Sequence, residues 1–565
     1  MRWTFKPEPD PQTVAHLQEV LNVDSIIASL LVQRGVETFG QARLFFKPTL
    51  ADLHDPYLMT DMEKAVRRIE HAIKKGENIL VFGDYDVDGT TAVSLVSSYL
   101  KTLTLSVATY IPDRYDEGYG VSFKGIDYAD DNGCTLIIAL DCGIKSIDHV
   151  AYAREKGIDF IICDHHRPGD TLPDAVAVLD PKREDCRYPY DELCGCGIGF
   201  KLIQALGMNR GQTARDLTSY LDLVATAIAA DIVPMTGENR ILAKFGLEVI
   251  NTNPRPGIKA LIGQIKKQQL DITDVVFIIA PRINAAGRIK HGDHAVKLLT
   301  EFDFDTAQHV AREIEQYNAD RKELDKVITQ QALRQIEENA EHDRFTTVVF
   351  QDDWHKGVIG IVASRLIETH YRPTVVFTKS GDKYAASARS VKDFDVYNAL
   401  QACSDHLEQF GGHMYAAGMT LKAEKYIDFK EAFEKVVRET MPEHLRTPEV
   451  LIDARLSFDQ ITPKLIRLLR QFEPFGPMNM TPVFAASDLT DTGFAKTIGS
   501  SNEHLRLYAR QRNSGGIAAI GFGLGKKLDI VRSPQAFEAA FCIDENEWNG
   551  TVSTQLRVKD VRAER

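Results

Sequence analysis

Asn78-Ile-Leu-Val-Phe-Gly-Asp-Tyr-Asp-Val-Asp-Gly89 is the most informative segment for the architecture of the central part of the chain. It is an apolar run that ends in Asp84, Asp86 and Asp88. Further apolar runs and helical patterns alternate after it, with the runs at 135–140, 159–163 and 175–179 and the helices at 90–103 and 147–156. Continuous apolar runs separated by helices are typical of a parallel sheet covered on both faces. The sequence therefore predicts an α/β domain, which we place at residues 53–250.

Acidic residues and histidines follow the ends of these runs. Asp141 comes after the second run, and Asp164-His165-His166 after the third. Ligands of an open α/β sheet bind outside the carboxyl ends of its strands, so these side chains are expected to converge with the first three aspartates. Asp231 is a lone carboxylate in an apolar stretch, and a buried carboxylate needs a partner.

Carboxylates packed this closely repel one another unless cations lie among them. Carboxylate oxygens with one or two imidazoles suit Mn²⁺ or Mg²⁺, and two such ions ~3.5–4 Å apart activate water for attack on a phosphoryl group. Each motif also has a simpler interpretation. The segment with the first three aspartates resembles a calcium-binding loop, although it lacks the downstream Glu of that motif. Asp141 could be a helix N-cap, and His165 and His166 could be structural histidines. A zinc site at Cys186, Cys194 and Cys196 lacks a C-x-x-C pair.

Bulk composition sets limits on the class of protein. The chain has 565 residues, of which 44% are hydrophobic and 26% charged, so three or four globular domains are expected. The N-terminus does not resemble a secretory signal, no apolar stretch is long enough for a membrane span, and the eight cysteines do not suggest disulfides, so we expect a cytoplasmic protein.

The net charge of −13 argues against a simple basic DNA-binding protein. Basic residues are nevertheless concentrated in two stretches, 255–290 and 496–527. The first holds seven Lys/Arg, at positions 255, 259, 266, 267, 282, 288 and 290, against Asp271 and Asp274. Such stretches are either solvated faces or the lining of a groove for a polyanion.

The remaining chain predicts further domains around residues 53–250. Residues 1–52 form an N-terminal segment, and 251–345 a helical connector that ends in a long charged helix over 304–342, with a coiled-coil arm as the alternative. Residues 346–445 predict a smaller α/β domain with strands at 346–350 and 374–377 and helices at 359–370 and 426–439. Residues 446–565 predict a β-barrel or sandwich with hairpins at 505–522 and 537–558.

Several motifs resemble those of a known group of enzymes. Gly83–Gly89, Ala139–Gly143, Cys163–His166 and Ala229–Pro234 resemble, in order, the four motifs of the DHH phosphoesterase superfamily. Three later stretches, Pro281–Arg288, Trp354–Arg365 and Phe410–Gly418, are similar to the bacterial RecJ family, and the last also resembles the signature of a DHHA1 domain. The resemblance runs from about residue 53 to the C-terminus and implies a DHH domain, a DHHA1 domain joined to it by the long helix, and an OB-type domain.

The resemblance also implies roles for particular residues. One ion would be held by Asp84, Asp86 and Asp141, and a second by Asp88, Asp141, His165 and Asp231. His166 would donate a hydrogen bond to the scissile phosphate, and Asp164 would orient an imidazole.

Residues outside the metal cluster would recognise the DNA. Arg389 and Ser387, with Arg114 as a further candidate, would hold the 5′-terminal phosphate, while Arg282 and His413 would line the DNA path. The simpler interpretation is that these arginines form ordinary ion pairs and that His413 lies in a turn. In the OB-type region Arg506, Tyr508, Arg510 and Arg512 share a parity and would share a strand face, either DNA-binding or merely solvated.

The expected activity is metal-dependent 5′→3′ exonuclease action on DNA that releases 5′-mononucleotides. We expect the substrate to be single-stranded, because a narrow passage between the two α/β domains would exclude duplex. By resemblance the enzyme would be a monomer that acts in DNA recombination and repair, with a single-strand-binding protein and a helicase as partners. The alternatives are a DHH phosphoesterase for short oligonucleotides or cyclic dinucleotides and a non-catalytic DNA-binding scaffold.

Overall fold

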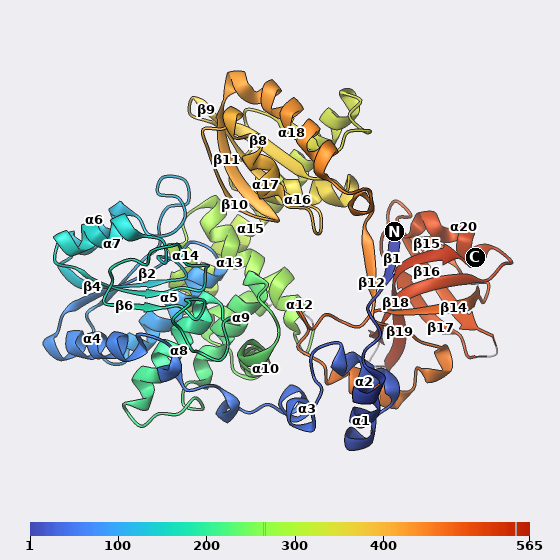
Figure 1. Cartoon of the computed structure of the whole chain (residues 1–565), viewed down its shortest axis with the longest axis horizontal. Helices are drawn as coiled ribbons and strands as arrows, with labels where there is room; N and C mark the ends of the chain where they lie inside the picture. The colour runs from blue at the N-terminus through green and yellow to red at the C-terminus, as the bar shows by residue number, and fades with distance from the viewer. Residues whose placement is uncertain (264, 266, 513, 549–550, 565) are drawn as a thin grey trace. The chain divides into compact units, whose positions relative to one another are not determined.

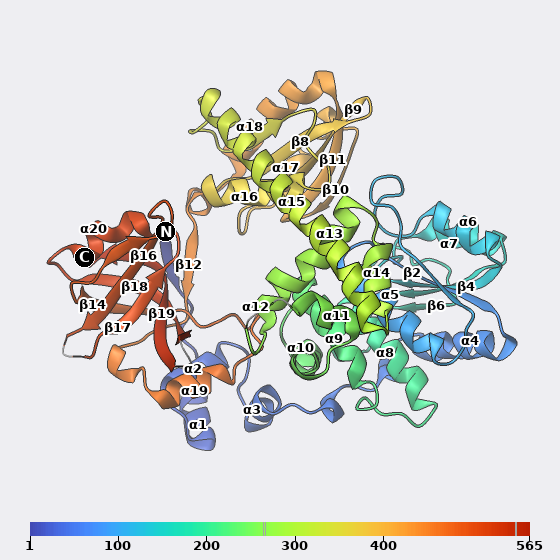
Figure 2. The same cartoon turned by 180° about the vertical axis from the view of Figure 1, so that it is seen from behind.

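The computed structural model describes residues 1–263, 265, 267–512, 514–548 and 551–564 (Figures 1 and 2). Lys266 of the first basic stretch, Asn513 and the turn predicted at 549–550 lie outside these residues. The chain divides into two compact units, one of residues Leu53–Arg446 and one that joins Met1–Asp52 to Thr447–Arg565. No single helix of the described residues is long and apolar enough to cross a membrane.

The first sheet of the Leu53–Arg446 unit is entirely parallel, as predicted. Its order is β3-β2-β4-β5-β6, with bounds Val107–Tyr110, Asn78–Gly83, Cys134–Leu140, Asp159–Cys163 and Ala177–Leu179. Helices α6 (Phe123–Asp131) and α7 (Ile147–Glu155) share an apolar core with this sheet. Helices α4 (Met62–Lys75), α5 (Val87–Lys101), α8 (Gly195–Met208) and α9 (Leu221–Asp231) pack with one another and with the strands. The sequence analysis missed β3, whose four residues are only half buried.

A helical layer follows the first sheet. It contains α10 to α15, with bounds Gly237–Thr252, Pro256–Ile262, Ile272–Asp274, Ala280–Ile289, Asp293–Thr300 and Phe304–Glu338, and a π-helical turn η4 at Val275–Ile279. The predicted long helix α15 has 35 residues. It packs on α11, α13 and α14 and then on α16 and β7. Because it has packing partners along its length, α15 is a connector and not a free coiled-coil arm.

The second sheet of this unit is mixed, with the order β10-β11-β9-β8-β7. Its strands are β7 (Thr347–Phe350), β8 (Thr374–Ser380), β9 (Lys383–Arg389), β10 (Gln409–His413) and β11 (Ala416–Lys422), and its helices are α16 (Ile359–Thr369), α17 (Val396–Gln401) and α18 (Tyr426–Thr440). Of its neighbouring strands, β7 and β8 pair parallel and the others antiparallel. Strands β7 and β8 and helices α16 and α18 were predicted, whereas β9, β10 and β11 were missed because Ala, Gly and Ser are weak strand signals.

The second unit is built around a seven-stranded sheet of order β13-β14-β18-β19-β17-β16-β15, in which β14 also pairs with β16. The bounds of β13 to β19 are Ala454–Arg455, Phe484–Asp491, Lys496–Ile498, His504–Gln511, Ile517–Gly521, Phe537–Trp548 and Thr551–Ala563. The two predicted hairpins are confirmed, since β16 pairs antiparallel with β17 and β18 with β19. A short helix, α20 (Leu528–Arg532), precedes β18.

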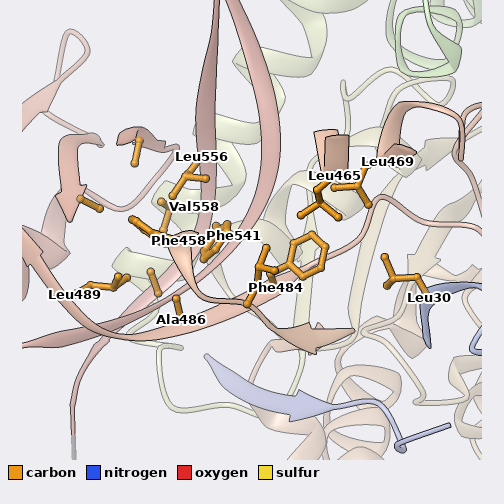
Figure 3. Packing of buried hydrophobic residues seen from close by; sticks show 14 of the residues in the cluster. Leu30, Phe458, Leu465, Leu469, Phe484, Ala486, Leu489, Phe541, Leu556 and Val558 are labelled. Carbon is orange, nitrogen blue, oxygen red and sulfur yellow. The ribbon is translucent and has the colours of Figure 1, made fainter. Parts of the chain in front are cut away.

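The two ends of the chain fold together in this unit. Strand β1 (Arg2–Phe5) pairs parallel with β12 (Glu449–Ile452). Helices α1 (Pro11–Leu21), α2 (Ser25–Val32) and α3 (Phe39–Phe46) share one apolar core with α19 (Pro463–Arg470) and the sheet. Figure 3 shows part of this core and labels Leu30 of α2, Leu465 and Leu469 of α19, and Phe484 of β14. Residues 1–52 therefore pack with the C-terminal region through a shared hydrophobic core.

Candidate active site

The predicted metal ligands gather at the carboxyl edge of the first sheet. Gly83, Leu140 and Cys163 are register partners on β2, β4 and β5. The residues that follow them, Asp84, Asp141 and Asp164, consequently leave the sheet at the same level. Asp86 caps α5 by accepting the Gly89 N–H at 2.9 Å, and Asp88 lies in the first turn of that helix. Asp231 is the last residue of α9.

His165 lies at the centre of the acidic group. Its Nε2 is 3.1 Å from Asp141 Oδ1, 3.6 Å from Asp231 Oδ2 and 3.8 Å from Asp88 Oδ2. Asp88, His165 and Asp231 can hold one ion between their ligand atoms. The structure thus brings together the four residues predicted for the second ion. For the first ion, Asp84 and Asp86 lie beside this group, and Asp84 Oδ1 accepts the Gly120 N–H at 3.1 Å.

The backbone of α8 holds the acidic group in place, which the sequence analysis did not foresee. The N–H groups of Gly195 and Cys196 donate to the two oxygens of Asp88 at 2.6 and 2.7 Å. A Cβ at position 195 would lie 2.5 Å from the Asp141 Cβ, so only glycine permits this approach. Asp141 itself adopts a φ of 59°, a strained conformation for a residue other than glycine.

The buried carboxylates at this edge of the sheet are expected to bind cations. Burial, followed by repulsion from neighbouring carboxylates, raises the pKa of Asp88 to about 7 and that of Asp231 to about 8. The same two causes raise the pKa values of Asp84 and Asp141 well above their ordinary value. Asp84 Oδ2 and Asp141 Oδ1 are buried and have no hydrogen-bond partner among the described residues. A donor set of carboxylates and one imidazole fits Mn²⁺ or Mg²⁺.

His166 lies beside this group and is held by Asp164. Asp164 Oδ1 is 2.7 Å from His166 Nδ1, and its Oδ2 accepts the Ile144 N–H at 2.9 Å. Burial opposes the charged imidazole, but the hydrogen bond to Asp164 outweighs it and raises the pKa of His166 to about 9. Tyr119, absent from the predicted site, places its hydroxyl 3.1 Å from His166 Nε2 and 3.3 Å from the Asp141 carbonyl oxygen.

A cleft of about 1080 Å³ runs from Asp84 and Asp86 to the second sheet. Four predicted DNA-binding residues line it: Arg114, Ser387, Arg389 and His413. Arg114 stacks over the Tyr85 ring at 4.4 Å. The cleft therefore has an acidic end at the metal ligands and a cationic end at the second sheet.

Arg288, and not Arg282, is the arginine of α13 that reaches the cleft. Arg282 donates to Glu315 and to the Ile278 carbonyl oxygen, and so stabilises the π-helical turn. Arg288 and Lys356 line the cationic end. Both stand in motifs noted in the sequence, but neither was assigned a role in the site. Burial and then the charges of Arg114 and Arg389 lower the pKa of Arg288 to about 9. A bound anion would relieve this repulsion.

A second cationic surface lies on the seven-stranded sheet. Along β16, the side chains of Arg506, Tyr508 and Arg510 are exposed, while the residues between them are buried. Tyr508 contacts the exposed ring of Phe494 edge-on, with 6.4 Å between the ring centroids. Arg512 lies beyond the end of β16 and pairs with Asp488 at 2.6 Å.

Comparisons with known proteins agree with these observations. Three family models match: the N-terminal domain of the DHH family at residues 78–228, the DHHA1 domain at 342–439 and the RecJ OB domain at 452–560. The single-stranded-DNA-specific exonuclease RecJ of Bacillus subtilis (strain 168) is 37% identical over 99% of this chain and 70% of its own length. The protein of the same name from Salmonella typhimurium is 33% identical over 89% of this chain and 90% of its own length.

Solved structures are also similar. RecJ from Thermus thermophilus in complex with Mn²⁺ has a TM-score of 0.86 and 27% identity over 100% of this chain and 80% of that chain. The complex of the same protein with Mg²⁺ has a TM-score of 0.78 and 26% identity over 100% and 79%.

Proposed function

The chain belongs to the RecJ family of the DHH/DHHA1 phosphoesterases, and on that premise we propose that it is a single-stranded-DNA-specific exonuclease that hydrolyses DNA from the 5′ end to 5′-mononucleotides. One observation carries this proposal: a cage of buried, mutually repelling carboxylates and one imidazole opens into a cleft whose far end is cationic. Such a cleft suits a nucleic acid that places its scissile phosphate at the ions and its 5′-terminal phosphate at the cationic end.

Asp84, Asp86 and Asp141 would hold one Mn²⁺ or Mg²⁺, and Asp88, Asp141, His165 and Asp231 a second. The ions would supply a water-derived nucleophile and neutralise charge on the phosphoryl group. His166, kept protonated by Asp164, donates through Nε2 to an oxygen of the scissile phosphate and gains strength as negative charge develops there.

Recognition of the terminal phosphate belongs to the cationic end. The guanidinium groups of Arg114 and Arg389 bind phosphate oxygens through paired N–H donors, and the Ser387 hydroxyl donates a further hydrogen bond. Arg288 and Lys356 add positive charge to the same end, and His413 lines the path. Anchoring the terminal phosphate here sets which phosphodiester meets the ions, and therefore sets the polarity and the size of the product.

The exposed face of β16 would bind the strand outside the cleft. Arg506 and Arg510 contact phosphates, while Tyr508 offers a ring on which a base stacks. The role in DNA recombination and repair, the partnership with a single-strand-binding protein and a helicase, and the monomeric state are further proposals that rest on family resemblance.

Digestion of end-labelled oligonucleotides with Mn²⁺ tests the proposal. Single-stranded DNA with a 5′-phosphate should be shortened from its 5′ end to mononucleotides even when its 3′ end is blocked. Duplex DNA of the same sequence should resist. Release of 3′-terminal nucleotides first, or equal attack on duplex DNA, would contradict it.

A further inference from the structure

One loop connects both ends of the cleft. Residues 112–120 between β3 and α6, here called the strap, carry Arg114 in the cleft and Tyr119 against His166. Its last residue, Gly120, donates its N–H to the metal-ligand candidate Asp84. The strap therefore contacts the residues proposed for terminal-phosphate binding and those proposed for catalysis.

Tyr119 completes the support of His166. Asp164 holds the imidazole at Nδ1, on one side of the ring. The Tyr119 hydroxyl lies 3.1 Å from Nε2, and it is itself located by the Asp141 carbonyl oxygen at 3.3 Å. The edge of one ring meets the other, with centroids 5.9 Å apart. The protonated imidazole has one Nε2 proton, which points toward the Tyr119 hydroxyl, and a phosphate oxygen beside that hydroxyl would share it. The contacts with Asp164 and Tyr119, on opposite sides of the ring, therefore orient this proton.

The strap is internally hydrogen-bonded between Arg114 and Tyr119. Asp113 Oδ1 accepts the N–H groups of Tyr115 and Asp116 at 2.8 and 2.9 Å. Glu117 accepts the Asp113 N–H at 2.8 Å and the Ser122 hydroxyl at 2.5 Å. These bonds span the whole segment between the two functional side chains.

The strap is also anchored at the far side of the cleft. The Tyr115 hydroxyl donates to the Arg288 carbonyl oxygen at 2.5 Å, and Arg288 Nη1 donates to the Gly357 carbonyl oxygen at 3.0 Å. A Cβ at position 357 would lie 2.2 Å from the Tyr115 hydroxyl, so a glycine is required for this contact. Tyr115 thus ties the strap to the loop that carries Lys356, one of the cationic residues.

From this connected set of contacts we infer that Tyr119 is a positioning residue for His166, and that the strap makes this positioning depend on a phosphate at the cationic end. The inference rests on the proposed roles of His166 and of the terminal-phosphate site. It adds that a 5′-phosphate speeds the chemical step as well as binding.

Steady-state kinetics of Tyr119→Phe in the full chain with Mn²⁺ test this, with 5′-phosphorylated and 5′-hydroxyl single-stranded DNA as substrates. The variant keeps the ring and loses the hydroxyl. We expect kcat on the phosphorylated substrate to fall about tenfold with KM within about twofold, because a hydrogen bond to a charged group is lost. Tyr152→Phe, the same change at a half-buried tyrosine of α7 bonded to Asp127, is the matched control and should retain wild-type kinetics.

Two further variants keep the inference testable if Tyr119→Phe is poorly folded. Tyr115→Phe should reduce the ratio of kcat between the two substrates toward one. In a His166→Ala background, under single-turnover conditions, Tyr119→Phe should cause no additional loss. A wild-type kcat for Tyr119→Phe, an unchanged kcat ratio for Tyr115→Phe, or a full additional loss in the His166→Ala background would each overturn the inference.

Failure of the proposed function gives a different result. If Arg389→Ala keeps the preference for a 5′-phosphate, or His166→Ala keeps wild-type activity, the proposed site itself is wrong and the inference is overturned with it.

Discussion

The acidic and the cationic ends of the cleft are built in different ways. Most of the acidic end projects from neighbouring strand ends and from the helices that follow them, where the register of a parallel sheet sets the spacing. The cationic end assembles single residues from separate segments: Arg114 from the strap, Arg288 from α13, Lys356 from a loop and Arg389 from β9. Repulsion between like charges is present at both ends, but among the described residues of the cleft the buried oxygens without a partner belong to the acidic end. The acidic end is therefore expected to hold bound metal ions, whereas the positive charge of the cationic end would be neutralised by a phosphate of the substrate.

Loss of a central ligand at the acidic end should have the largest effect. Asp141→Asn removes a carboxylate proposed to bridge both ions, and we expect kcat to fall by about 10³-fold or more. The variant should also gain less thermal stability from added Mn²⁺ than the wild type. Digestion of labelled single-stranded DNA and thermal melting measure the two effects. Asp174→Asn, at an exposed residue paired with Arg154, is the control, and the same loss in that variant would refute the comparison.

Two arginines of α13 give a matched test of the cationic end. Arg288→Ala should raise KM for 5′-phosphorylated DNA about tenfold, because a charged contact to phosphate is lost. Arg282→Ala should leave KM near the wild-type value, since that guanidinium is bound to Glu315 and Ile278 outside the cleft. Thermal melting of both variants separates binding from folding. Equal KM effects in the two variants would show that α13 presents both residues to the DNA.

Stability against pH should report on the acidic end when metal is absent. The native pKa values of Asp88, Asp231 and His166 are raised to about 7, 8 and 9, so the native state binds these protons more tightly than the unfolded state. Stability should fall between the ordinary and the native pKa of each group, from 3.8 to about 7 and 8 for the two carboxyls and from 6.5 to about 9 for His166. We expect the Tm of chelator-treated protein to drop by about a few degrees from the lower to the upper end of this range, and Mn²⁺ to remove most of the drop. A Tm that rises over the same range without metal would contradict this account.

The smallest effect is expected on β16, in the unit that contains the two ends of the chain. Arg506→Ala should raise KM for long single-stranded DNA about twofold and reduce the slope of log KM against log salt by about 0.7, the value for one phosphate contact on a single strand. Arg512→Ala should change neither, because Arg512 pairs with Asp488. A titration of KM with NaCl for both variants gives the slopes. An unchanged slope for Arg506→Ala would mean that this face is merely solvated.

Much of the acidic end could be predicted from the sequence, and for a clear reason. Apolar runs mark parallel strands, and the residues just beyond them must meet at one edge, so Asp84, Asp141 and His165 were expected to converge. The hairpins were equally local, since in each of them two strand patterns flank a turn signal. Neither prediction required knowledge of contacts between distant segments.

The residues of the cationic end could not all be predicted in this way, because their positions depend on tertiary packing. The motif Pro281–Arg288 contains two arginines, and six positions along a helix place them about 120° apart, so the tertiary packing of α13 alone decided that Arg288 faces the cleft. The contact of Tyr119 with His166 and the approach of Gly195 to Asp141 likewise depend on loops and helices that pack across the sheet.

Residue type and short-range periodicity were sufficient to predict many of the elements, the chemistry of the strand ends and the family resemblance of the chain. The pairing of β1 with β12, the core that the first helices share with the last domain, and the set of cations that lines the cleft became evident only in the folded protein. Such pairings join residues hundreds of positions apart, and their free energy comes from burial and shape complementarity, which no local pattern encodes.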